Sequence, residues 1–239
     1  MQSSDINKSI SAWWTQGDTE PERGDHAVSS ALLRVTEPIH LLNLDGQLAI
    51  GRGGTVTMGK KIPSPPEGVP LLAYAPPLPP ENLGDPQFKK TYHLRYAYIA
   101  GAMANGITSV EMVERAGRAG MVGFFGAAGL SLDQIEAAID WLQKSLKDIP
   151  FGFNLINSPN DPELEAAVVQ LYLRRGIRLV SSSAYLDLTL PLVYYRVKGI
   201  HRDKNGRVVC PNKVIAKVSR VEVARKYFSP PPEKLLAQL

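Results

Sequence analysis

The 239-residue sequence is poor in features that define whole classes of protein. Its single cysteine, Cys210, allows no disulfide within the chain, so we expect a reducing, cytoplasmic setting. No apolar run approaches the roughly 18 residues that a membrane-spanning helix needs. The first residues lack the basic-then-apolar pattern of a secretory signal. We therefore expect neither a disulfide scaffold nor a membrane span.

Several motifs for catalysis or binding are also missing. There is no Walker loop and no Gly-x-Ser-x-Gly elbow, and the four histidines show no metal-ligand spacing, so we expect no metal. The glycines at 123, 126 and 129 lie between a predicted strand and a helix, but no acidic residue follows at the distance of a dinucleotide site. Ten Lys or Arg residues against two acids lie between Arg196 and Lys226. Without a nucleic-acid motif, this basic segment is either a solvated face or a surface for an acidic partner.

Three regions precede the C-terminal part of the chain. Residues 1–30 are polar, with five acidic residues against two basic ones, and we expect a flexible segment. Residues 31–62 alternate around Asp45-Gly46, a pair typical of a tight hairpin turn, and predict a β-hairpin. Residues 63–94 include nine prolines between 63 and 86, which predict an extended strap or linker on the surface of the next region.

Residues 95–239 alternate short apolar runs with amphipathic helical patterns. The runs "RYAYIAGAM", "MVGFFGA", "PFGFNLI", "IRLVSSS" and "VIAKVS" predict five strands. Thr108 with Glu111 and Ser131 with Gln134 fit capping boxes of the intervening helices. This βα rhythm predicts an α/β fold with a parallel sheet. An open doubly wound sheet and a closed (β/α)₈ barrel share the pattern, and the pattern alone leaves both open.

Residues with little or no side chain crowd the stretch from Tyr98 to Ser131, in which seven of 34 residues are glycine and alanine is as frequent. Such residues either let backbone layers pack closely or let a flat or phosphorylated ligand approach the backbone. In both candidate architectures ligands bind just beyond the carboxyl ends of strands. Met103 and Asn154 stand at such positions, where a polarizable thioether and an amide suit a planar heteroaromatic cofactor.

Specific blocks of the sequence resemble a known family. They are "GAMANGITSVEMVERAGRAGMVGFFGAAGLS", "PFGFNLINSPNDPELE", "VSSSAYLDLTLPLVYYRVKGI" and "KVIAKVSRVEVA". The first is similar to the opening of the FMN-dependent nitronate monooxygenase (2-nitropropane dioxygenase) superfamily, which includes FabK-type enoyl-ACP reductases. Taken together, the blocks resemble the PfaD family, the enoyl reductase component of polyunsaturated fatty acid and polyketide synthases.

The resemblance implies a TIM-barrel flavoprotein, with residues 95–239 as part of an FMN-binding barrel. Its FMN, recharged by NADPH or NADH, would reduce an enoyl thioester on an acyl carrier protein, and the basic segment would face that acidic carrier. The matching FMN contacts would be Gly101, Ala102, Met103 and Asn154, with Ser182 and Lys217 at the ring edge or the thioester. The family's active-site histidine has no counterpart, so no catalytic residue is assigned.

The length of the barrel region departs from the family's pattern. A TIM barrel takes roughly 250 residues, whereas the 144 residues from Tyr96 to Leu239 have room for about five of its eight βα units. The family's Asp-Ser-Gly-Gly-His segment and glycine-rich phosphate loops are absent. We therefore expect a C-terminally truncated chain. The alternative functions are a nitronate monooxygenase-type flavoprotein and an inactive fragment that depends on a partner.

Overall fold

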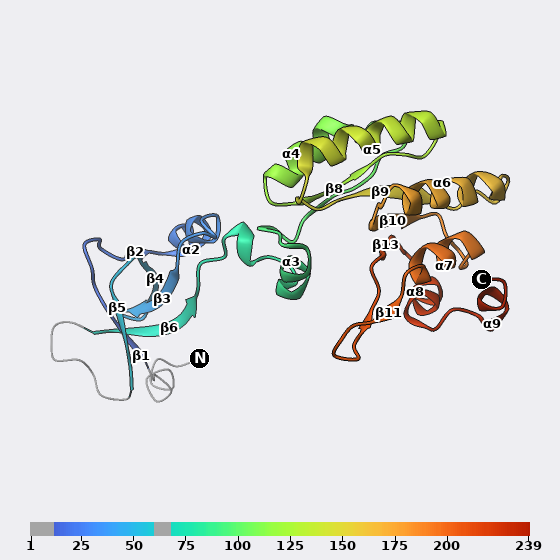
Figure 1. Cartoon of the computed structure of the whole chain (residues 1–239). Coiled ribbons are helices and arrows are strands. Elements are labelled where there is room, and N and C mark those ends of the chain that lie inside the picture. Colours follow the sequence, from blue (N-terminus) through green and yellow to red (C-terminus); the bar gives the residue numbers. More distant parts are fainter. Residues whose placement is uncertain (1–11, 60–67) are drawn as a thin grey trace. The chain divides into compact units, whose positions relative to one another are not determined.

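A computed structural model describes residues 12–59 and 68–239 of the chain (Figure 1). The chain divides into two compact units, Met1–Leu83 and Gly84–Leu239. Among the described residues, no helix is both long enough and apolar enough to cross a bilayer.

An antiparallel sheet forms the N-terminal unit. Its six strands lie in the order β2-β4-β3-β6-β1-β5. They are β1 (Ala12–Thr15), β2 (Glu22–Arg23), β3 (Ile39–Leu44), β4 (Gln47–Gly51), β5 (Thr55–Met58) and β6 (Val69–Ala75). Helix α2 (Asp25–Leu32) buries Ala27 and Ala31 against Ile50, and Trp14 is fully buried with Leu42 and Ala49. A short 3₁₀ turn, η1 (Pro80–Asn82), ends the unit.

The hairpin predicted around Asp45-Gly46 is confirmed. Strands β3 and β4 pair antiparallel with Leu44 opposite Gln47, which leaves Asp45 and Gly46 as a two-residue loop. Their φ angles are 54° and 83°, as a primed turn requires. The Asn43 side chain accepts a hydrogen bond from the Gly46 amide at 2.9 Å and closes the turn.

Two boundaries in the N-terminal region differ from the sequence-based expectation. Residues 12–30, expected to be flexible, contribute β1, β2 and α2; residues 1–11 lie outside the described part. The expected proline-rich strap contains β6, which lies inside the antiparallel sheet between β3 and β1. Pro70 is tolerated because β6 pairs with β1 only at Val69 and Pro70 and with β3 only from Leu71 onward, so the missing N–H falls where β6 changes partner.

The second unit is built on a five-stranded parallel sheet in the order β13-β10-β9-β8-β7. The predicted five strands and the α/β class are therefore confirmed. The elements, in chain order, are α3 (Pro86–Tyr92), β7 (Ile99–Ala100), α4 (Val110–Arg118), β8 (Val122–Phe125), α5 (Leu132–Leu146), β9 (Phe151–Ile156), α6 (Pro162–Arg174), β10 (Leu179–Ser183), α7 (Leu190–Val197), β11 (His201–Arg202), β12 (Val208–Val209), β13 (Lys213–Ala216), α8 (Val221–Phe228) and α9 (Glu233–Leu236).

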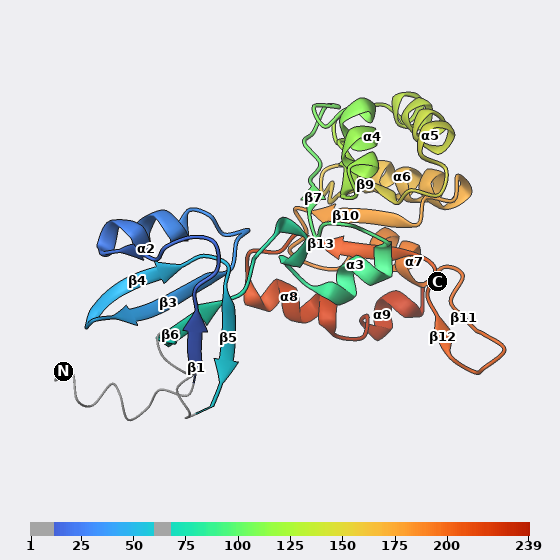
Figure 2. The same ribbon diagram turned by 90° about the vertical axis from the view of Figure 1, so that its left-hand side faces the viewer.

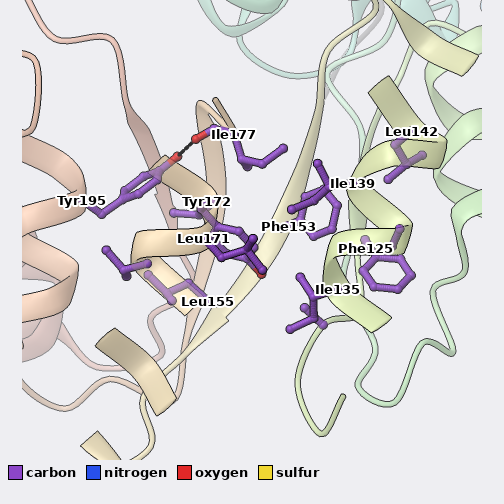
Figure 3. Packing of buried hydrophobic residues seen from close by; sticks show 14 of the residues in the cluster. Phe125, Ile135, Ile139, Leu142, Phe153, Leu155, Leu171, Tyr172, Ile177 and Tyr195 are labelled. Atoms are coloured by element: carbon purple, nitrogen blue, oxygen red, sulfur yellow. Dashed lines mark hydrogen bonds between the residues drawn. The ribbon is translucent and has the colours of Figure 1, made fainter. Parts of the chain in front are cut away.

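Helices cover one face of this sheet. The side chains of Phe125, Phe153, Leu155 and Val180 point to this face and pack against α5, α6 and α7, as Figure 3 shows for Ile135, Ile139 and Tyr172, among others. The Tyr195 hydroxyl donates to the Ile177 carbonyl at 2.9 Å and fixes α7 to the connection between α6 and β10. We call this the helix-covered face.

Successive residues of a strand point to opposite faces, so the alternate positions form a second face. Val122, Phe124 and Leu179 point there and are buried with Phe88 and Tyr92 of α3, and with Ile215 of β13. We call this the inner face, because it would be the interior of a closed barrel. The sheet is thus a curled half-barrel with α3 packed against its inner face.

Candidate functional site

The carboxyl ends of the five parallel strands meet at one edge of the sheet, where ligand sites of such folds lie. The loops at this edge follow Ala100, Phe125, Ile156, Ser183 and Ala216. Gly101, Ala102, Met103 and Lys217 lie in two of these loops, and Asn154 and Ser182 lie near the carboxyl ends of β9 and β10.

Thr108 organises the loop after β7. Its hydroxyl is buried, donates to the Gly101 carbonyl and accepts from the Met103 amide, both at 2.8 Å. The predicted capping role of Thr108 is wrong: Ser109 caps α4 by accepting a hydrogen bond from the Met112 amide. The Thr108 side chain instead folds the loop back, which leaves Gly101 and Met103 exposed at the edge.

Close backbone packing accounts for several of the small residues in this stretch. A Cβ on Gly126 would overlap the Met103 carbonyl, and one on Gly129 would overlap the Asn105 side chain. On Gly123 it would lie 2.9 Å from the Cα of Val113 in α4. These glycines let the β7 and β8 loops, and helix α4, approach the sheet.

Gly101 has no such explanation. A Cβ there would have no neighbour within 4 Å, and Gly101 is absent from the residues with a positive φ. Neither packing nor backbone conformation requires a glycine at this exposed position. Open space above the backbone is what a ligand that lies directly on the chain needs.

Asn154, in β9, is on the inner face, and the structure holds its side chain in a defined orientation. Its Oδ1 accepts a hydrogen bond of 2.9 Å from the Ser183 hydroxyl of β10, and its backbone carbonyl accepts from the buried Tyr172 hydroxyl at 2.8 Å. Among the described residues, none accepts a hydrogen bond from the Nδ2 amide. That donor is available to a ligand oxygen.

The two remaining candidates differ in where their side chains point. Lys217 is exposed one residue beyond β13, in phase with Lys213 and Ile215 of the inner face. Ser182 is buried on the helix-covered face, where its hydroxyl accepts a 2.9 Å hydrogen bond from Tyr227 of α8. The structure therefore brings Gly101, Met103, Asn154 and Lys217 to the edge and its inner face, and separates Ser182 from them.

The sequence analysis missed a hydrogen-bonded group of three polar side chains at this edge, those of Glu165, Tyr185 and Thr189. Glu165 of α6 is only 3% exposed, and one of its oxygens accepts hydrogen bonds from the hydroxyls of Tyr185 and Thr189. Burial, and then the nearby Glu165 charge, raise the pKa of Tyr185, so this hydroxyl stays protonated as a donor. The one signal in the sequence was an acidic residue within an otherwise apolar helix face, and a single such residue is ordinarily solvated.

A small cavity of about 60 Å³ borders Glu165 at the ends of β8 and β9. Ala127, Gly129, Asn154, Ser158 and Glu165 contribute to its walls. It is large enough for one or two water molecules and too small for a nucleotide. This cavity therefore cannot hold a larger ligand, and the open backbone at Gly101 beside exposed Met103 is the other part of the edge that could receive one.

The edge fits one side of a flavin. Gly101 supplies open backbone, the Met103 side chain is 45% exposed beside it, and Asn154 holds an oriented amide donor. A flat apolar ring with carbonyl oxygens at its rim would satisfy these three groups together. Ala102 is partly buried against Val122, Phe124 and Leu179 of the inner face, and this contact anchors the loop to the sheet. The described residues offer no group of three metal ligands.

Fold and edge together define a parallel βα half-barrel with a candidate ligand site at the carboxyl ends of its strands. No family model matches the chain. The chain is 48% identical over 160 residues to the polyketide biosynthesis protein PksE of Bacillus subtilis (strain 168), covering 66% of this chain and 21% of that protein. It is 38% identical over 199 residues to a component of the polyunsaturated fatty acid synthase of Thraustochytrium sp., covering 83% of this chain and 13% of that protein.

The chain is also similar to a solved structure from a biosynthesis cluster. The enoyl reductase domain of MlnA, from the macrolactin biosynthesis cluster of Bacillus amyloliquefaciens, superposes with a TM-score of 0.64 at 44% identity, over 67% of this chain and 37% of that one. The resemblance to PfaD-like enoyl reductases of polyketide and polyunsaturated fatty acid synthases is thereby confirmed. The chain spans 37% or less of the length of each of these relatives.

Proposed function

We propose that this chain forms the flavin-ring side of an FMN-dependent enoyl reductase that serves polyketide or polyunsaturated fatty acid synthesis. The observation that carries the proposal is the unexplained glycine: Gly101 has open space where a side chain would stand, beside exposed Met103. The 44% identity to the MlnA enoyl reductase domain supports the same assignment. The single cysteine, a free thiol, suits a cytoplasmic enzyme.

The residues at the edge would contact different parts of the cofactor and substrate. When bound, FMN would take hydride from NADPH or NADH and supply it to the double bond of an enoyl thioester. Gly101 and Met103 would bear one face of the ring, because the loop is held rigid by Thr108. Asn154 would donate its Nδ2 hydrogen bond to the ring edge. Lys217 would offer a positive charge to the thioester side.

An acyl carrier protein is the proposed source of the substrate. The basic segment has two parts in the structure: the hairpin of β11 and β12 precedes β13, and Lys217 follows it. Figure 2 shows the hairpin at the tail of the β13 arrow, at the end of the sheet away from the carboxyl edge. Because a substrate must reach that edge, we propose that an acidic carrier meets the chain near Lys217 rather than at the hairpin.

Two substrates distinguish this proposal from the nitronate monooxygenase alternative. FMN binding to the purified chain would be measured first, by quenching of flavin fluorescence. NADPH oxidation would then be followed with a crotonyl thioester on carrier protein and, separately, with a free alkyl nitronate. Saturated product from the thioester supports the reductase. Turnover of the nitronate alone would transfer the assignment to the monooxygenases. Absence of FMN binding would favour the inactive fragment that depends on a partner.

A further inference from the structure

Glu165 is a buried carboxylate that the proposed flavin contacts do not use. It lies in the first turn of α6, where the positive end of the helix favours a negative charge. Its Oε1 accepts hydrogen bonds from the Tyr185 hydroxyl, at 2.9 Å, and from the Thr189 hydroxyl. Tyr185 and Thr189 belong to the loop between β10 and α7, so one carboxylate ties α6 to the next βα loop.

The residue before Tyr185 is under backbone strain. Ala184 has a φ of 62°, in the left-handed region that costs a non-glycine residue on the order of 1 kcal/mol. Hydrogen bonds hold it on both sides: Tyr185 donates to Glu165, and Ser183 donates to Asn154 Oδ1 at 2.9 Å. The strained turn therefore joins the buried carboxylate to the amide proposed to bind flavin.

This connection decides which way the Asn154 amide points. Ser183 is the last residue of β10, where it pairs with Ile156, and its hydroxyl donates to Oδ1 at the point where the strand passes into the left-handed turn at Ala184. Releasing Tyr185 would let Ala184 relax and would remove the partner that keeps Nδ2 directed away from Ser183. Glu165 and Asn154 also contribute to the walls of the same small cavity.

We propose that Glu165 is a positioning residue: its carboxylate holds the Ser183–Tyr185 turn so that the Asn154 amide presents Nδ2 to the ligand. The proposal rests on the proposed flavin site, but its first consequence concerns Asn154 itself. A carboxylate suits this role better than an amide, because hydrogen bonds to a charged acceptor are about twice as strong as neutral ones.

Two variants test the proposal. Tyr185→Phe removes one hydroxyl and keeps the ring volume, whereas Glu165→Gln keeps an oxygen acceptor and removes the charge. Glu136→Gln is the matched control, since Glu136 pairs with Arg175 at the outer side of α5 and contacts neither the turn nor Asn154. The Asn154 side-chain amide resonances and the FMN dissociation constant would be measured for each, together with thermal unfolding.

We expect Tyr185→Phe to shift or broaden the Asn154 amide resonances and to weaken FMN binding about tenfold, as the loss of one charge-assisted hydrogen bond implies. Glu165→Gln should give a smaller loss in both, and Glu136→Gln none. Unchanged Asn154 resonances in a folded Tyr185→Phe protein would overturn the positioning role. If the resonances shift but the parent chain binds no FMN, the positioning role stands and the proposed flavin site fails.

Discussion

At the scale of single residues, two glycines differ in role: Gly126 allows close packing, and Gly101 is proposed to allow ligand binding. Gly126 has no room for a side chain because the Met103 carbonyl occupies it, whereas Gly101 has only open space. The sequence could not distinguish these two uses of glycine, since both residues follow a predicted strand. Substitutions at Gly101 and Gly126 are therefore expected to have different effects.

Gly101→Val is expected to leave the free energy of unfolding within about 0.5 kcal/mol of the parent chain, because an exposed change that meets nothing costs little. The same change should weaken FMN binding at least tenfold, because the isopropyl group would occupy the space proposed for the ring. Urea unfolding and flavin fluorescence measure the two quantities. Full FMN affinity in Gly101→Val would exclude a ligand at this backbone.

Gly126→Ala is expected to behave in the opposite way. Its Cβ would overlap the Met103 carbonyl, so the loops after β7 and β8 must separate, at a cost of about 3 kcal/mol in unfolding free energy. The lowered midpoint should be visible in the absence of flavin. A stable Gly126→Ala protein would show that these loops are not in close contact.

At the scale of elements, α3 supports the half-barrel from its inner face. Its N-cap Asp85 accepts a hydrogen bond from the Gln87 amide at 2.8 Å, and Phe88 and Tyr92 pack on Phe124, Leu179 and Ile215. The sequence analysis assigned these residues to a surface strap, because proline composition describes local chain stiffness and not the layer against which a segment packs. The strand β6 was missed for the same reason.

Phe88→Ala should lower the unfolding free energy of the second unit by about 2–3 kcal/mol, somewhat less than a fully buried Phe would. The ring is partly buried between α3 and the sheet and contacts Tyr92 with centroids 4.9 Å apart. The matched control is Phe228→Ala, because Phe228 is 90% exposed. Equal stability of the two variants would contradict the packing of α3 on the inner face.

We propose that the hairpin of β11 and β12 does not bind the carrier protein, although it carries part of the basic segment. Three connections from helix to strand, α4–β8, α5–β9 and α6–β10, take three or four residues, whereas α7–β13 takes residues 198–212. Reversing the charges of Arg202, Lys204 and Arg207 should leave KM for a carrier-bound enoyl substrate within about twofold. Lys217→Glu should raise that KM several-fold, and more at low salt. The reverse pattern would move the carrier to the hairpin.

At the scale of the whole molecule, the sequence predicted the parallel βα order, the five strands and the resemblance to enoyl reductases. Periodicity carries this information, because buried strands and amphipathic helices repeat at different intervals. Periodicity cannot say which face of a strand meets which layer: Asn154 and Ser182 both lie in strands, yet they point to opposite faces. In the Glu165 network, Tyr185 and Thr189 lie 20 and 24 positions from Glu165 in the sequence. No local sequence pattern predicts contacts at that separation.

Buried tyrosines make the stability of the second unit sensitive to alkaline pH. Burial raises the pKa values of Tyr172, Tyr185 and Tyr195 above the value of about 10 for an unfolded chain. The folded state therefore holds protons that the unfolded state releases, and stability is full below pH 10 and falls as pH rises beyond it. Urea midpoints between pH 8 and 11 should decline from about pH 10, less steeply in Tyr172→Phe. A flat profile would contradict the burial of these hydroxyls.

The most direct test of the central claim is an FMN titration of the isotopically labelled chain, followed by NMR. We predict that the largest amide shifts fall on Gly101, Met103 and the Asn154 side chain, while Arg202 and Val208 of the hairpin stay unchanged. The Gly101→Val protein should show none of these shifts. FMN-dependent shifts that avoid the carboxyl edge, or that persist in Gly101→Val, would contradict the proposed flavin site.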